Sequence, residues 1–173
     1  MEKDIIILKA DITTLNVDVI VNAANRSLLG GGGVDGAIHK AAGPDLLEAT
    51  KKLGGANTGD AKITKGYNLP ANFVIHTVGP IYRDGTENEA SLLAACYKNS
   101  LQLAEEEKLK TIAFSAISTG VYGYPIKEAA DIAISTVNQV LPKLKHVKKV
   151  IFVVFNDEIK TIYEKSYVGN KGK

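Results

Sequence analysis

A carboxylate, an amide and an imidazole lie close to a run of four glycines at residues 30–33. Asn25 precedes the glycines, and Asp35 and His39 follow them. If the loop folds back on a ligand, the amide and the carboxylate reach the same part of it, where a carboxylate can act as a general base. His39 is four residues after Asp35 and therefore lies on the same face of a helix, close enough to orient the carboxylate or to share proton transfer. A carboxylate next to an imidazole could position a water molecule or transfer a proton.

Each of these residues also has a simpler interpretation. Asp35 could be an acid in the first turn of a helix, where it balances the helix dipole. A single histidine in a helix is usually structural. Because a helix N-terminus stabilises a carboxylate, we expect Asp35 to position water more than to take its proton.

Two glycine-containing loops could hold an anion. Residues 30–33 run into a helix N-terminus, where backbone N–H groups and the helix dipole favour negative charge. Residues 118–125 follow a predicted strand and precede a second helix, and open α/β sheets bind ligands at that edge. Charge-assisted hydrogen bonds from two such loops could hold a diphosphate without a basic side chain. The alternatives are a flexible loop and an ordinary Gly-Pro turn.

Other nucleotide-binding motifs are weak or absent. Gly31, Gly33 and Gly36 match the G-x-G-x-x-G pattern, but some ten residues separate them from the preceding strand and no acidic residue ends a following strand. The sequence contains no Walker A motif.

The composition predicts a single domain without a metal or other cofactor. The chain has 173 residues, 45% of them hydrophobic, with 21 Lys and Arg against 19 Asp and Glu. This balance argues against nucleic-acid or membrane binding, and no apolar run approaches the ~20 residues of a membrane span. Cys96 is the only cysteine, and the three histidines are scattered, so we expect no disulfide, no metal site and a cytoplasmic location.

The elements that must position these loops alternate between strands and helices. Short β-branched runs predict strands at residues 5–8, 19–22, 62–65, 73–77, 111–116 and 150–155. Apolar residues at three-and-four spacing predict helices at residues 35–42, 44–53, 90–107, 126–140 and 157–167. Several strands are apolar throughout, as expected when helices cover both faces of the sheet. The prediction is an α/β fold, a three-layer α/β/α sandwich over residues 1–168, with a disordered tail at 169–173.

Four motifs in order resemble the macrodomain family, in particular its MacroD-type ADP-ribosyl hydrolases. They are Ala-Asp-Ile-Thr at 10–13, Val-Asn-Ala-Ala-Asn at 21–25, the glycine loop with its helix at 30–39, and Ser-Thr-Gly-Val-Tyr-Gly-Tyr-Pro at 118–125. The resemblance implies a mixed, mostly parallel sheet with ADP-ribose in a cleft at its upper edge. One departure is Ala10, where many members have glycine before the aspartate.

The resemblance also implies roles for individual residues. Asp11 accepts a hydrogen bond from adenine, although it could instead cap the following turn, and Phe155 packs on the adenosine, although a single aromatic is often a core residue. Asn25 orients the distal ribose, Asp35 holds or activates water, and Tyr122 caps the ribose. The implied ligand-binding set is Asp11, Ile12, Asn22, Gly31, Gly32, Gly33, Val34, Ser118, Thr119, Gly120, Val121, Tyr122 and Phe155.

The function implied is hydrolysis of an ester at the distal ribose of ADP-ribose. The substrates expected are proteins that carry ADP-ribose on acidic side chains, or O-acetyl-ADP-ribose, and the chain is expected to act as a monomer. Attack at the acyl carbon and attack at the anomeric carbon both remain open. The alternative is a non-catalytic reader that binds ADP-ribose or its polymer in the same pocket.

Overall fold

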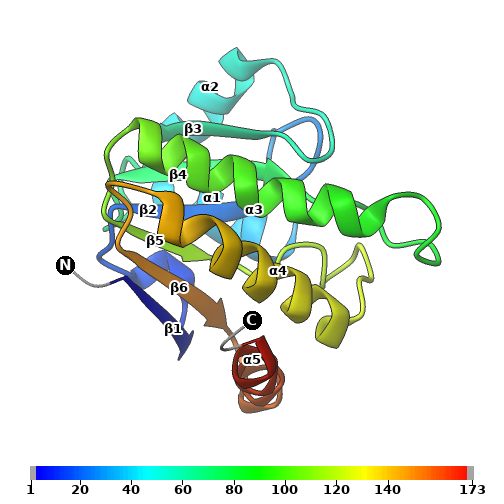
Figure 1. Cartoon of the computed structure of the whole chain (residues 1–173). Coiled ribbons are helices and arrows are strands. Elements are labelled where there is room, and N and C mark those ends of the chain that lie inside the picture. The colour runs from blue at the N-terminus through cyan, green and yellow to red at the C-terminus, as the bar shows by residue number, and fades with distance from the viewer. Residues whose placement is uncertain (1–2, 171–173) are drawn as a thin grey trace.

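A computed structural model describes residues 3–170 and shows a six-stranded sheet between two layers of helices (Figure 1). The strands are β1 (Asp4–Lys9), β2 (Val19–Ala24), β3 (Ala61–Lys65), β4 (Phe73–Val78), β5 (Thr111–Phe114) and β6 (Lys149–Val154). The α-helices are α1 (Gly33–Ala42), α2 (Pro44–Leu53), α3 (Glu89–Glu106), α4 (Ile126–Val140) and α5 (Asp157–Asn170). Two short 3-10 turns are η1 (Ile12–Thr14) and η2 (Leu141–Lys143).

The sheet is mixed and mostly parallel, as predicted. Its strand order is β1-β6-β5-β2-β4-β3, and only the edge strand β3 runs antiparallel to its neighbour. The register places Asn22 of β2 beside His76 of β4. The carboxyl ends of the five parallel strands therefore meet at one edge, the position where open α/β sheets bind ligands.

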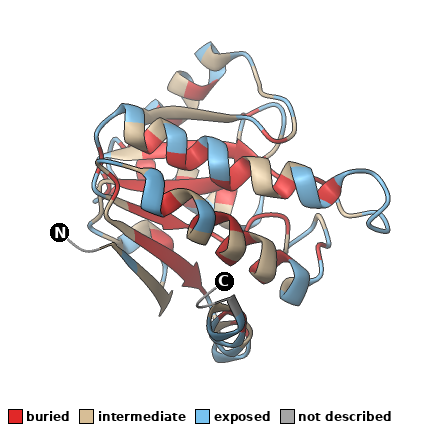
Figure 2. Cartoon of the chain, in the orientation of Figure 1, coloured by how far each residue is buried: buried red, intermediate tan, exposed pale blue. Residues whose placement is uncertain are grey.

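Two apolar cores lie on opposite faces of the sheet. The larger core packs α3, α4 and α5 on the face that is near the viewer in Figure 1, and the buried layer is visible in Figure 2. The smaller core packs η1, α1 and α2 on the other face, around residues such as Ile38 and Leu46. Both faces of the sheet are thus covered, which confirms the three-layer prediction.

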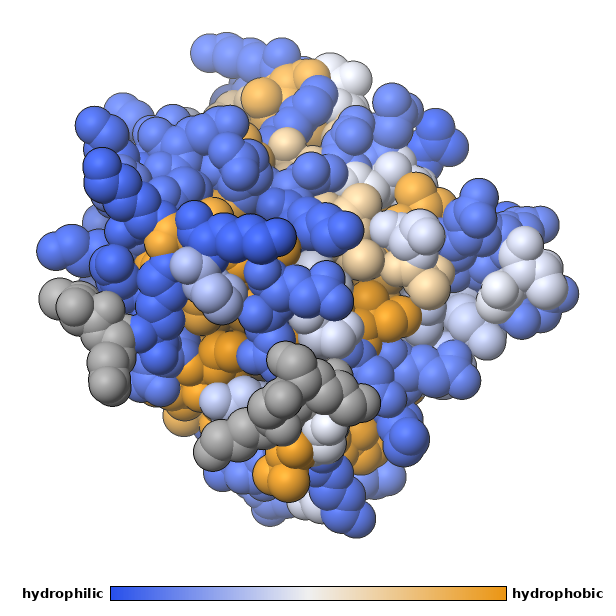
Figure 3. Space-filling view, in the orientation of Figure 1, coloured by the Kyte–Doolittle hydropathy of each residue, from blue (hydrophilic) through white to orange (hydrophobic). Residues whose placement is uncertain are grey.

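The edge strand β1 shows why its apolar run does not alternate. Ile5 and Ile7 pack against the larger core, and Ile6 and Leu8 pack against the smaller one. As an edge strand, β1 is only half buried. The outer surface of α3 and α4 is mostly hydrophilic (Figure 3), and none of the helices in residues 3–170 is long and apolar enough to cross a membrane.

Several elements end one to three residues away from the predicted positions; β2, for example, continues to Ala24 and α1 begins at Gly33. Strand β5 ends at Phe114, two residues before Ala116, and β6 ends at Val154, so that Phe155 lies in a bend rather than in the strand. Helix α5 continues to Asn170, so residues 169 and 170 of the expected tail are helical. The rest of that tail, residues 171–173, lies outside the described residues.

Candidate active site

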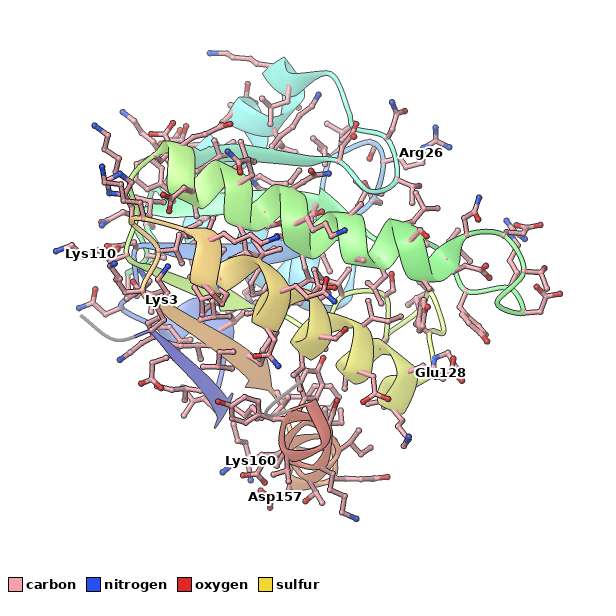
Figure 4. The ribbon with its side chains drawn as sticks, viewed as in Figure 1. Lys3, Arg26, Lys110, Glu128, Asp157 and Lys160 are labelled. Carbon is pink, nitrogen blue, oxygen red and sulfur yellow. The ribbon has the colours of Figure 1, made fainter. Side chains whose placement is uncertain are left out.

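A cleft of about 980 Å³ opens at the carboxyl ends of the parallel strands. In Figure 4, Arg26 and Glu128 lie towards this edge, and Lys3 and Lys110 lie at the opposite one. Of the sequence-predicted residues, the cleft is lined by Asp11, Ile12, Asn25, Gly31, Gly32, Gly33, Val34, Asp35, Ser118, Thr119, Gly120, Val121, Tyr122 and Phe155. Asn22 and His39 are not part of this lining. Among the described residues, Lys9 is the only basic one in this lining, and its Nζ lies 3.2 Å from Asp157 Oδ1.

The Asn25 side chain holds the first glycine loop in shape. Its Nδ2 donates to the Gly30 carbonyl at 2.9 Å, and its Oδ1 accepts hydrogen bonds from Ser27 Oγ at 2.7 Å and from Leu28 N at 3.1 Å. Leu28 has a φ of 60°, a conformation that such hydrogen bonds help to stabilise. Both ends of the amide are therefore used within the loop, so Asn25 shapes the wall of the cleft.

Gly31 brings the backbone of this loop between the amide and the carboxylate. A Cβ atom at Gly31 would lie 3.3 Å from both Asn25 Nδ2 and Asp35 Oδ2. A side chain here would push against both groups, which gives the glycine a packing reason that composition alone does not reveal.

Asp35 lies in the first turn of α1 and is only 5% exposed. Its Oδ1 accepts a hydrogen bond from Asn22 Nδ2 at 2.8 Å and lies 3.4 Å from His39 Nε2. Its Oδ2 faces Gly31, a residue that lines the cleft. One oxygen is thus held from behind, and the other lies next to the loop that lines the cleft.

The structure places Asn22 behind the residues that line the cleft. This residue is fully buried on β2, and its amide donates to the Asp35 carboxylate, so it lies behind that carboxylate. Asn22 points to the α1 side of the sheet because it alternates with Val21 and Ala23, whose side chains pack on the larger core. His39 also sits behind the cleft lining and contacts Asp35 as its four-residue spacing predicts.

Two residues behind Asn22, the buried His76 and the partly buried Thr64, were not predicted as part of the site. His76 of β4 is fully buried, with its Nδ1 3.3 Å from Asn22 Nδ2 and its Nε2 3.0 Å from Thr64 Oγ1 of β3. Burial, with a smaller effect of His39, lowers the pKa of His76 to about 3, so the ring is neutral at physiological pH. A histidine inside an apolar strand was the only signal in the sequence.

The second loop is held by the segment that follows β4. Ser118 has a φ of 67°, and its Oγ donates to the Pro80 carbonyl at 2.8 Å. Tyr82 N donates to the Tyr122 carbonyl at 2.8 Å, and the Tyr82 and Tyr124 rings lie 4.8 Å apart. The loop that contains Ser118 and Tyr122 is therefore fixed to residues 80–82.

Glu89, in the first turn of α3, organises the loop that follows Tyr82. Its Oε2 accepts hydrogen bonds from the backbone N–H groups of Arg83, Asp84 and Gly85 at 3.0, 3.3 and 3.0 Å, and its Oε1 accepts one from Glu87 at 2.6 Å. Backbone hydrogen bonds, of which that from Arg83 has the largest effect, lower the pKa of the Glu89 carboxyl to about 2, although burial acts to raise it.

We expect Glu89→Gln to lower the melting temperature and to weaken ADP-ribose binding. The loop at residues 83–87 would lose the carboxylate that its N–H groups bind, and Tyr82, which precedes this loop, would be held less firmly. A lowered folded-state pKa contributes stability above the unfolded value near 4.5, and this stability is lost as the pH falls towards about 2. The melting temperatures of the unmodified protein and of Glu89→Gln should therefore converge over that pH range.

Glu105→Gln is the matched control, because the Glu105 carboxylate accepts hydrogen bonds from three backbone N–H groups, those of residues 145–147, away from the cleft. An equal loss of ADP-ribose affinity in both variants would contradict the prediction.

At the other end of the cleft, Asp11 caps η1. Its Oδ1 accepts hydrogen bonds from Thr13 N at 3.0 Å and Thr13 Oγ1 at 2.7 Å, so the capping role is present, and both bonds use the same oxygen. Phe155 is 73% exposed and lines the cleft, so it is not a core residue. An exposed aromatic on a cleft wall is available for stacking.

A family model described as Macro domain matches residues 21–133, the segment that carries both loops. The chain belongs to the macrodomain family. Within residues 3–170, this macrodomain has no group of three or more His, Cys, Asp or Glu side chains placed to hold a metal ion.

Named relatives cover most of the macrodomain. The chain is 56% identical over 163 residues to O-acetyl-ADP-ribose deacetylase of Klebsiella pneumoniae, covering 92% of this chain and 93% of that protein. It is 57% identical over 159 residues to ADP-ribose glycohydrolase MACROD2 of Xenopus laevis, covering 91% of this chain but 38% of that protein. A structure of an Oceanobacillus iheyensis macrodomain variant with ADP-ribose superimposes with a TM-score of 0.92 at 46% identity, covering 96% of this chain and 93% of that one.

Proposed function

We propose that this macrodomain binds ADP-ribose and hydrolyses an ester at its distal ribose. The substrates would be proteins with ADP-ribose on acidic side chains, O-acetyl-ADP-ribose, or both. The names of two relatives, an O-acetyl-ADP-ribose deacetylase and an ADP-ribose glycohydrolase, support this proposal. We further propose that it acts as a monomer in the cytosol, which suits its free and buried Cys96 thiol.

The observation that carries the proposal is the placement of Asp35. Its Oδ1 is held by Asn22 and lies close to His39, and its Oδ2 lies beside Gly31 in the cleft lining. A ligand whose diphosphate accepts hydrogen bonds from backbone N–H groups of both loops would place its distal ribose near this oxygen. A water molecule held by Oδ2 could then attack the ester.

In the proposed reaction, the water oxygen forms a bond to the acyl carbon while the bond from that carbon to the ribose oxygen breaks. The ribose hydroxyl leaves with one proton, and the carboxylic acid releases another. Attack at the anomeric carbon would instead place the water oxygen on the ribose. Reaction in ¹⁸O-water separates the two routes, because acyl attack labels the released acid and anomeric attack labels the released ADP-ribose.

The direct test is to mix the protein with a substrate that carries ADP-ribose on aspartyl or glutamyl side chains, and separately with O-acetyl-ADP-ribose. We expect release of ADP-ribose from both substrates, and chromatography detects it. Tight binding of ADP-ribose without release of product from either substrate would overturn the hydrolase and indicate a reader.

Phe155→Ala should weaken ADP-ribose binding while leaving the fold intact. Stacking of an aromatic ring on a base contributes about 1–3 kcal/mol, so the dissociation constant should rise by roughly 5- to 150-fold in calorimetry. Because Phe155 is 73% exposed, its loss should barely change the melting temperature. Val168→Ala on α5 is a matched control, since Val168 is also exposed, at 71%, but does not line the cleft. Unchanged affinity in Phe155→Ala would remove this residue from the adenosine site.

A further inference from the structure

The buried amide of Asn22 is held by its nitrogen alone. Nδ2 lies 2.8 Å from Asp35 Oδ1 and 3.3 Å from His76 Nδ1, and Oδ1 has no hydrogen-bond partner among the described residues. An unpartnered buried oxygen is costly, so its presence in the core needs a reason. The reason offered by the geometry is that both N–H bonds of the amide are required where they point.

Asp35, Asn22, His76 and Thr64 form a hydrogen-bonded cluster. The positions of its protons follow from the group at the Asp35 end. An ionised Asp35 can only accept, so the Asn22 nitrogen must face it. The second N–H of the amide then points to His76 Nδ1, which must be the unprotonated nitrogen of a neutral ring. The ring proton is therefore on Nε2, which donates to Thr64 Oγ1, and the threonine hydroxyl donates onward to the Lys65 carbonyl at 3.1 Å.

The cluster connects the antiparallel edge strand to the candidate site. Thr64 is on β3, His76 on β4, Asn22 on β2 and Asp35 on α1, so each hydrogen bond crosses from one element to the next. A rotation of the Asn22 amide by half a turn would put its oxygen against the carboxylate, which would repel Asp35. Holding the amide in one orientation therefore holds Oδ1 of Asp35.

We propose that His76, fixed in its Nε2–H form by Thr64, is a positioning residue that sets the orientation of Asn22 and through it that of the Asp35 carboxylate. The inference rests on the proposed hydrolytic function, since it assigns His76 and Thr64 to the geometry of that reaction. Neither residue lines the cleft, so neither contacts the substrate. Their effect should therefore fall on turnover and not on ligand affinity.

Two pairs of variants test the proposal. His76→Leu removes the acceptor at Nδ1, and His76→Asn can present its Oδ1 near that position. Thr64→Val removes the hydroxyl at constant shape, and Thr64→Ser keeps it. We expect kcat to fall about 10- to 100-fold in His76→Leu, because small displacements of a catalytic group have effects of that order. Thr64→Val should have a smaller effect in the same direction, and the two conservative variants should recover most of the turnover.

Thr77→Val is the matched control. Thr77 is the next residue of β4, is equally buried, and donates its hydroxyl to the Asp60 carbonyl at 2.8 Å without contacting the cluster. It should keep the turnover of the unmodified chain. All assays are run below the melting temperature of each variant, with ADP-ribose affinity measured by calorimetry.

The outcomes separate this inference from the proposed function. Loss of kcat with unchanged ADP-ribose affinity, recovered by His76→Asn and Thr64→Ser, supports it. If His76→Leu has the same kcat as the unmodified chain, or if Thr77→Val loses as much kcat as His76→Leu, the role of His76 is overturned, whereas the proposed hydrolase activity is not affected. No hydrolysis by the unmodified chain overturns the proposed function, and the inference with it. A ¹⁵N NMR spectrum of the His76 ring should show the neutral Nε2–H form down to about pH 5, and an Nδ1–H form would overturn the proton assignment.

Discussion

Asp35→Asn should lower the rate of ADP-ribosyl ester hydrolysis by about 10²–10⁴-fold, the range that a general base contributes. The substitution keeps the shape of the side chain but removes the negative charge next to Gly31. Because the proposed diphosphate and adenosine contacts involve other residues of the cleft, we expect ADP-ribose affinity to change by only a few-fold. Single-turnover hydrolysis and calorimetry measure the two effects separately.

Asp45→Asn is a suitable control for this prediction. Asp45 is also an acid in the first turn of a helix, α2, but it is exposed and does not line the cleft. Both substitutions remove a charge that favours a helix N-terminus. If Asp45→Asn lost as much activity as Asp35→Asn, or if Asp35→Asn kept full turnover, Asp35 would have no specific part in the reaction.

Gly36→Ala should lower ADP-ribose affinity by about 10²-fold or more. Gly36 lies within α1, and a Cβ atom there would overlap the carbonyl oxygen of Gly31. The backbone of the glycine loop would have to move away from α1. Charge-assisted hydrogen bonds contribute about 1.5–3 kcal/mol each, so displacing one or two of the donors is enough for this loss. Calorimetric titration with ADP-ribose measures it.

A matched glycine lies in α5. Gly169→Ala also adds a methyl group to a helix, but apart from the adjacent residues and the nearby backbone of α5, no heavy atom of the described residues lies within 4 Å of the added Cβ. This variant should bind ADP-ribose normally. Normal binding in Gly36→Ala would mean that the position of residue 31 is not important for the ligand.

The sequence predicted the order and type of the main elements because each carries a strong apolar pattern. The strand ends were less predictable: Phe155 continues an apolar run, yet it lies in a bend and is exposed on the cleft wall. The pairing of β6 with β1 ends where Val154 lies opposite Lys9. This end is set by how the two strands pair, and the residue type at position 155 does not indicate it. The glycines likewise indicated a loop but not that Gly31 lies against Asn25 and Asp35.

The site was predictable where residues lie close in sequence and not where strands bring them together. The Asp35–His39 pair follows from helical spacing alone. His76 is 54 residues from Asn22, and only the parallel register of β2 and β4 makes them neighbours. Asn22 was therefore assigned to the ligand, although the alternation of side chains along β2 turns it towards Asp35 behind the cleft.

The unequal cores have a dynamic consequence for the layer that carries Asp35. Helix α1 is attached to the sheet by the smaller core, so its separation would leave the larger core of α3, α4 and α5 intact. Openings that expose less apolar surface cost less free energy than global unfolding. We therefore expect the layer that carries Asp35 to open more readily than the rest of the protein, and a ligand that bridges both loops to suppress this opening.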